Sequence, residues 1–204
     1  MAGARRRLGT LLFPDFELLD VCGPLEVLGH LKDHFEVGLV AEQAGPVRSI
    51  QGVALVAEHD LDGCPPLDVL LVPGGLGTRR EVDNVRLLAW LRARSEAAAL
   101  VMTVCTGSGL LARSGALDGR RATSNKRAFE WATSQGPHVD WVRRARWVDD
   151  GKFVTSSGVS AGIDMTLHVV AREIDGALAE EIAWRIEHAW HRDPDADPFV
   201  EPRS

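Results

Sequence analysis

Cys105 is the residue whose type and position in this sequence are best suited to nucleophilic chemistry. It follows the apolar run ALVMTV (99–104) and precedes the small residues TGSG (106–109), after which apolar residues return. This pattern predicts a strand that ends at the cysteine and a helix that begins directly after it. The first N–H groups of a helix lack partners within it, and their partial positive charge favours a thiolate. The alternative is a buried thiol that only packs as a small hydrophobic residue.

Backbone N–H groups near Cys105 could also stabilise negative charge that develops on a substrate. Thr106 directly follows the cysteine, so its N–H is the natural donor. A second donor could come from Gly74 and Gly75, which end the apolar run LDVLLVPGG (67–75) on a neighbouring strand. The hydroxyl of Thr106 could contact the substrate or cap the helix.

The elements that must position these groups alternate between strands and helices. The expected strands are 8–13, 35–41, 67–75 and 99–104, with one hairpin within 45–59 and another within 141–158. The expected helices are 23–31, 84–98, 106–113, 160–175 and 177–190. Strands that alternate with helices in this way predict an α/β fold with a mostly parallel sheet between helical layers.

Three irregular loops should converge at the carboxyl ends of the strands. They are PDFELLDVCGP (14–24), PGGLGTRR (73–80) and CTGSG (105–109), and each follows a predicted strand. In open parallel sheets, ligands bind where the loops after the strands meet. The sequence therefore predicts a site built from segments that are far apart along the chain.

Length and composition favour a single globular domain over residues 1–204. A hydrophobic content of 45% suffices for a large core, with a basic tail expected at 1–7 and a surface tail at 191–204. The 29 acidic residues outnumber the 23 basic ones, which argues against a nucleic-acid partner. Neither a membrane helix nor a signal peptide is expected, so the predicted location is the cytoplasm.

The remaining motifs predict neither a metal nor a cofactor. The three cysteines lack CxxC spacing, and Cys22 is interpreted as a buried spectator, although it could approach Cys105 and be redox-active. His188 and His191 stand one helical turn apart without a third ligand, which is typical of a solvated helix end. The segment GGLGTRR lacks the third glycine of a dinucleotide-binding loop.

Several segments resemble the DJ-1/PfpI superfamily, and within it most closely the isonitrile hydratase branch. The resemblance rests on segments that occur in the order of the family: LLFPDFELLDVCGPLEVL (11–28), VPGG (72–75), VCTGSGLLARSGALDGRRAT (104–123) and TSSGVSAGIDMTL (155–167). It implies a flavodoxin-like three-layer α/β sandwich, usually a homodimer. It also implies that the cysteine occupies a strained strand-to-helix turn, the nucleophile elbow.

The resemblance implies an acidic partner for Cys105. The superfamily places a carboxylate from the first loop against the thiol, and the aligned residue here is Asp20. A buried carboxyl that faces a thiolate has a raised pKa and can shuttle a proton. The alternative for Asp20 is a helix N-cap, because Asp is common at that position.

The resemblance also brings the loop with Gly158 and Ser160 near the thiol, where Ser160 could bind substrate or cap the next helix. Asn125 stands where related sequences often carry a histidine, and no nearby histidine replaces it. A Cys–His peptidase pair is therefore not expected. Asn125 could line the site or start the next helix.

Together these features favour a cofactor-independent hydro-lyase that converts an isonitrile to an N-substituted formamide. Cys105 would be the nucleophile and Asp20 the acid and base, acting on a small-molecule substrate. Two alternatives stay open. One is a stress-response protein whose cysteine is oxidised or acts on reactive carbonyls. The other is a non-enzymatic ligand-sensing domain, like the one that AraC-type regulators contain.

Overall fold

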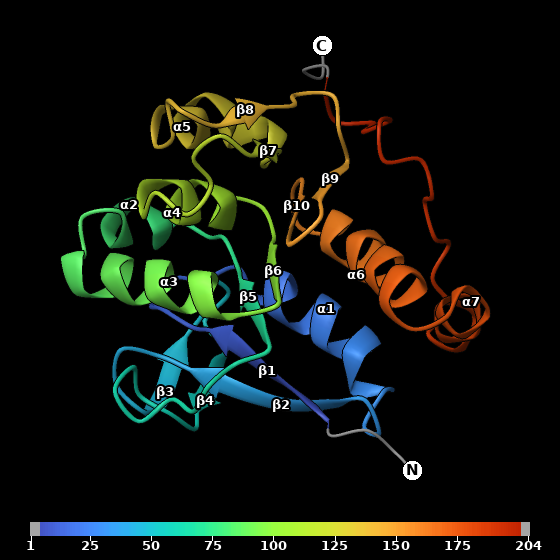
Figure 1. Ribbon diagram of the computed structural model, residues 1–204, viewed down its shortest axis with the longest axis horizontal. Helices are drawn as coiled ribbons and strands as arrows, with labels where there is room; N and C mark the ends of the chain where they lie inside the picture. The colour runs from blue at the N-terminus through green and yellow to red at the C-terminus, as the bar shows by residue number, and fades with distance from the viewer. Residues whose placement is uncertain (1–4, 201–204) are drawn as a thin grey trace.

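The computed structural model describes residues 5–200. Within that range the chain forms a central six-stranded sheet of order β2-β1-β5-β6-β10-β9 (Figure 1). The strands are β1 (Arg6–Leu11), β2 (Phe35–Val40), β5 (Val69–Val72), β6 (Leu100–Thr103), β9 (Trp147–Asp150) and β10 (Phe153–Ser156). Neighbouring strands are parallel, except that β9 is antiparallel to β10. The predicted mostly parallel sheet is confirmed.

Helices cover both faces of the sheet, which makes the fold a flavodoxin-like three-layer sandwich. On one side lie α1 (Leu18–Gly29), α6 (Ala161–Glu173) and α7 (Gly176–Arg185), and on the other lie α2 (Thr78–Glu81), α3 (Val85–Ala97) and α4 (Gly107–Arg113) (Figure 1). Side chains of β5 alternate between two cores. Leu70 and Val72 belong to one, and Val69 and Leu71 to the other. Burial on both faces explains why this strand is apolar throughout.

Smaller elements lie beside the main sheet. The strands β3 (Gly45–Arg48) and β4 (Ala54–Ala57) pair as the predicted antiparallel hairpin. The strands β7 (Arg121–Ala122) and β8 (Asp140–Trp141) form a parallel pair, with η1 (Lys126–Ala128) and α5 (Phe129–Ser134) between them in sequence. The second predicted hairpin consists of β9 and β10 alone, which turn at Gly151 with a φ of 70°. The predicted hairpin segment, 141–158, starts too early, because Trp141 belongs to β8, where it pairs with Ala122.

Two helices differ from their predicted ranges. α1 begins at Leu18 rather than residue 23, and it carries Pro24 in its interior rather than in its first turn. Pro24 removes one N–H donor, and the buried side chains of Val21 and Val27 on either side hold the helix against the core. α7 ends at Arg185 rather than residue 190, shortly before Glu187 adopts a φ of 52°, which is incompatible with a continuing helix.

The two predicted tails, residues 1–7 and 191–204, are partly integrated into the fold. Arg6 and Arg7 form part of β1, whereas residues 1–4 and 201–204 lie outside the described residues. Residues 191–200 follow the surface without regular secondary structure, but Asp197 in this segment is buried. The C-terminal segment is therefore fixed to the domain at that residue.

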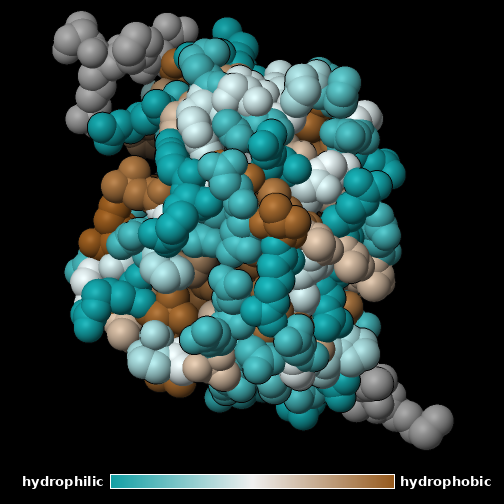
Figure 2. Space-filling view, turned by 90° about the vertical axis from the view of Figure 1, so that its left-hand side faces the viewer, coloured by the Kyte–Doolittle hydropathy of each residue, from teal (hydrophilic) through white to brown (hydrophobic). Residues whose placement is uncertain are grey.

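The face that bears α2 and α3 carries mainly hydrophilic side chains, with smaller hydrophobic patches among them (Figure 2). Of the helices that the structure describes, none is both long enough and apolar enough to cross a membrane.

Candidate active site

Cys105 occupies a strained turn between β6 and α4. Its φ of 58° is rare for a residue other than glycine. The backbone is held there from both sides, because its N–H donates to the carbonyl of Ser157 (3.0 Å) and its carbonyl accepts from the hydroxyls of Ser124 (2.9 Å) and Ser108 (3.1 Å). This geometry is that of a nucleophile elbow, in which neighbouring segments fix the position of the sulfur.

Asp20 lies in the first turn of α1 and is completely buried. Its Oδ2 accepts a hydrogen bond from the N–H of Gly74 at 2.8 Å. Burial raises the pKa of Asp20 to about 8, while the bond from Gly74 and the interaction with the Cys105 thiol act in the opposite direction. The alternative role as N-cap is excluded, because Glu17 occupies that position and the Asp20 side chain points to Gly74.

The charge of Asp20 and the surrounding protein also act on the thiol. Burial raises the pKa of Cys105 above its usual value, and the negative charge of Asp20 raises it further. The N–H groups of Thr106 and Val159 and the side chain of Asn125 bind the sulfur and lower the pKa by less. The N–H of Thr106 at the helix start thus favours the thiolate, but burial and the charge of Asp20 outweigh it, so the pKa of Cys105 stays above its usual value. Cys105 and Asp20 titrate as a coupled pair.

The N–H groups of Gly74 and Gly75 do not serve as the predicted oxyanion donors. The first binds Asp20, and the second donates to the hydroxyl of Thr106 at 3.1 Å. That hydroxyl also receives a hydrogen bond from Thr78 at 3.2 Å, so it joins two loops instead of facing a substrate or capping α4. Of the predicted donors, the N–H of Thr106 is the one that faces the sulfur.

Two residues at the sulfur were not assigned this role from the sequence. Val159 presents its N–H to Cys105 with a φ of 40°, which is strained for a β-branched residue. Asn125 uses its Oδ1 to accept from the N–H groups of Arg127 (2.9 Å) and Ala128 (3.1 Å), while its side chain also binds the sulfur. Asn125 therefore both lines the site and starts η1. Gly158 leaves room for this side chain, because a Cβ there would overlap Asn125 Nδ2 and displace it from its position.

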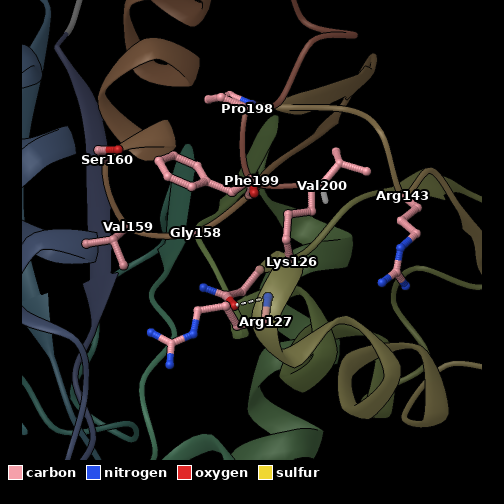
Figure 3. A pocket seen from close by; sticks show the side chains of 11 residues that line it. Lys126, Arg127, Arg143, Gly158, Val159, Ser160, Pro198, Phe199 and Val200 are labelled. Carbon is pink, nitrogen blue, oxygen red and sulfur yellow. Dashed lines mark hydrogen bonds between the residues drawn. The ribbon is translucent and has the colours of Figure 1, made fainter. Parts of the chain in front are cut away.

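A pocket of about 1100 Å³ opens beside these residues (Figure 3). Its lining residues come from the η1 region, the loop before α6 and the C-terminal segment: Asn125, Lys126, Arg127, Arg143, Ser157, Gly158, Val159, Ser160, Pro198, Phe199 and Val200. Ser160 is thus placed in the pocket wall, and it makes no capping hydrogen bond to α6. Cys105 keeps 6% of its surface exposed and lies behind Asn125 and Val159.

Other candidate residues lie away from this arrangement. Cys22 is exposed, so its interpretation as a buried spectator is wrong, and it forms no disulfide. His188 is not a solvated helix end, because its Nε2 lies 2.8 Å from the buried Asp164. Among residues 5–200, no group of three or more His, Cys, Asp or Glu side chains is arranged to hold a metal ion.

Replacing Asp20 by asparagine is expected to change the free energy of unfolding in a pH-dependent way. Relative to the wild type, the variant should be more stable at pH 8 than it is at pH 4. Unfolding returns the pKa of Asp20 from about 8 to 3.8. The unfolded chain therefore releases this proton first as the pH rises, and the wild type loses stability between these two values. The difference in pKa corresponds to a loss of at most about 6 kcal/mol. Urea unfolding of both proteins at the two pH values tests this, and equal shifts at both would contradict it.

A flavodoxin-like sandwich with a buried carboxyl against an elbow cysteine defines the class of protein. The sequence profile of the DJ-1/PfpI family matches residues 6–172, and the chain belongs to this family. It is 36% identical over 186 residues to the isonitrile hydratase of Pseudomonas putida, covering 90% of this chain and 78% of that protein. A ThiJ/PfpI family protein from Pseudomonas syringae has a similar structure, with a TM-score of 0.85, 30% identity and coverage of 92% and 77%.

A second group of relatives consists of transcriptional regulators. The transcriptional regulator GbdR of Pseudomonas aeruginosa is 28% identical over 181 residues, which cover 86% of this chain. The match spans only 49% of the regulator. Membership of the family therefore does not decide between an enzyme and a regulatory domain.

Proposed function

We propose that this protein adds water to an isonitrile, R–N≡C, and releases the formamide R–NH–CHO. The observation that carries the proposal is the buried pair of Asp20 and Cys105 at a strained elbow beside a pocket. Such a pair can deliver a nucleophile and a proton to the same atom, which is what addition to the terminal carbon of an isonitrile requires. The likeness to the isonitrile hydratase supports the same choice of substrate class.

The reaction begins when the pair holds one proton. The sulfur of Cys105 forms a bond to the terminal carbon, and the carboxyl of Asp20 gives its proton to that carbon. The product is a thioimidate, R–N=CH–S, attached to Cys105. The N–H groups of Thr106 and Val159 and the side chain of Asn125 stabilise negative charge on the sulfur before it attacks.

Water then releases the product. Asp20, now a carboxylate, accepts a proton from water while the oxygen bonds to the thioimidate carbon. Asp20 passes this proton to the nitrogen. The C–S bond then breaks while the new hydroxyl gives its proton to Asp20, so that Asp20 and the sulfur again share one proton. The net change is the addition of one water molecule, and no oxidant, reductant or metal takes part in these steps.

Incubation with an aryl isonitrile in ¹⁸O-labelled water tests this function. We expect the formamide to carry one labelled oxygen and the protein to turn over many times. The Cys22→Ser variant is the matched control, because it removes an exposed thiol. Tight binding of the isonitrile without formamide release would contradict the proposal and favour a sensing domain.

Oxidation of Cys105 is less well supported as a function. Oxidation by peroxide depends on thiolate character and on access. The raised pKa and the burial of Cys105 limit both. Selective gain of two oxygens on Cys105 in mild peroxide, measured by intact mass, would reverse this preference.

A further inference from the structure

The pocket beside Cys105 is basic, although the chain as a whole carries a net charge of −6. Its lining includes Lys126, Arg127 and Arg143, and no acidic residue is among the described side chains that line it. Hydrating an isonitrile group calls for no positive charge at the far end of the substrate. The basic lining therefore needs an explanation beyond the reaction itself.

Lys126 and Arg143 are committed to partners within the protein. Lys126 is buried, and its Nζ binds the carbonyl of Ala145 (2.6 Å) and lies 3.7 Å from Asp197. Arg143 pairs with Glu130 at the exposed rim. In Figure 3, Arg143 lies on the side of the pocket away from Gly158 and Val159. These two charges are largely accounted for by the fold.

Arg127 differs from both. It is exposed, it lines the pocket, and its side chain extends toward the side of Val159 in Figure 3. Among residues 5–200, no carboxylate forms an ion pair with its guanidinium. Asn125 fixes the backbone N–H of Arg127 at 2.9 Å, so the start of this side chain is held next to the group that binds the sulfur.

Arg79 is not part of the pocket lining, but it places a further positive charge near Cys105. Its guanidinium stacks on Trp131 at 3.8 Å and donates to the hydroxyl of Thr78 at 3.0 Å. It, too, has no ion-pair partner in the described part of the chain. Burial lowers the pKa of Arg79 and the charge of Cys105 acts in the opposite direction, so the two groups interact electrostatically.

The C-terminal segment forms an apolar part of the pocket wall and is anchored to the domain. Pro198, Phe199 and Val200 line the pocket, and Phe199 remains 52% exposed. Asp197 anchors this segment because it is buried and lies 4.0 Å from Arg146 as well as near Lys126. The volume of about 1100 Å³ exceeds what a small alkyl isonitrile fills. The pocket thus offers an apolar surface and an arginine, Arg127, that forms no ion pair with a carboxylate of residues 5–200.

We infer that the substrate is an isonitrile whose apolar R group ends in a carboxylate, and that Arg127 binds this carboxylate. This inference rests on the proposed function. Arg127 would be a specificity-determining residue, the C-terminal segment would contact the R group, and Arg79 would strengthen the local positive potential. A guanidinium and a carboxylate form charge-assisted, often bidentate, hydrogen bonds, which a neutral ester cannot match.

The test compares 4-isocyanobenzoate with its methyl ester. For the wild type we expect kcat/KM to be about tenfold higher for the carboxylate, mainly through KM, with the preference falling as salt is added. Arg127→Gln should remove the preference, because it should lower kcat/KM for the carboxylate far more than for the ester. Arg143→Gln, the matched control with the same loss of charge, should keep it. Equal kcat/KM for both substrates, or equal losses on both in Arg127→Gln, would overturn the inference.

A binding measurement separates this inference from the proposed function. Calorimetry with 4-formamidobenzoate and its methyl ester needs no turnover. Tighter binding of the carboxylate by the wild type, lost in Arg127→Gln, would support the anion site even if neither isonitrile were hydrated. Hydration of both isonitriles without any difference in binding would refute the anion site and leave the proposed function intact.

Discussion

Replacing Cys105 by serine is expected to lower formamide release by at least about a thousandfold. The hydroxyl is close in size to the thiol, so the elbow, held by Ser157, Ser124 and Ser108, should persist. A serine hydroxyl ionises far less readily than a thiol, and its oxygen is a weaker nucleophile toward the isonitrile carbon. Steady-state formamide release by the two proteins gives the ratio.

Two controls make this prediction specific. Cys22→Ser should retain full activity, because that thiol is exposed and free. Denaturant unfolding should show that Cys105→Ser remains folded. Formamide release by a folded Cys105→Ser variant at more than a tenth of the wild-type rate would show that the sulfur is not the nucleophile.

Replacing Asp20 by asparagine is expected to lower kcat/KM by about a hundredfold or more and to flatten its pH dependence. With an uncharged isonitrile, the pH profile of kcat/KM reports the free protein. The reactive form of the pair holds one proton, and the pKa of Asp20 is about 8. Wild-type kcat/KM should therefore rise with pH up to about 8 and then level off. The variant should lack this rise.

Glu17→Gln provides a finer test of the same assignment. Burial is the main cause of the raised pKa of Asp20, and the negative charge of Glu17 raises this pKa further. Its removal should move the inflection to lower pH and leave the plateau rate unchanged. A wild-type profile that falls above pH 8 would mean that the fully protonated pair is the active form, which contradicts the proposed first step.

Much of the fold could be predicted from local pattern. The buried strands β5 and β6 appear as uninterrupted apolar runs, and the amphipathic helices α3 and α6 were located to within two residues. The start of α1 was missed because Pro24 suggested a first turn, whereas tertiary packing of Val21 kept the helix continuous across it. The extent of β9 was missed because Trp141 pairs with β7, a contact that is not local.

The site was predictable in its two main residues but not in its electrostatics. Cys105 follows from its position between strand and helix, and Asp20 from the family resemblance. The pKa of Cys105 depends on how deeply folding buries it, which no local pattern reveals. The roles of Gly74 and Gly75 depend on which acceptors other loops present. No sequence signal marks Val159, because β-branched residues rarely adopt a positive φ.

The homodimer and the cytoplasmic location stay predictions, since one chain tests neither. The oligomeric state can be measured by sedimentation at several protein concentrations. The oligomeric state matters for the pocket, because a second copy of the chain could cover the exposed Phe199 at the pocket rim.

Trapping the covalent intermediate tests the central claim most directly. The wild type, mixed with an excess of an aryl isonitrile and quenched with acid before one turnover is complete, should carry an adduct whose mass equals one whole isonitrile molecule. The Asp20→Asn variant should form this adduct much more slowly, because it lacks the proton donor of the first step. Peptide mapping should place it on Cys105 and not on Cys22 or Cys64. Covalent catalysis by this sulfur would be contradicted by a wild-type protein that releases labelled formamide while its Cys105 peptide, sampled by rapid quench, never gains this mass.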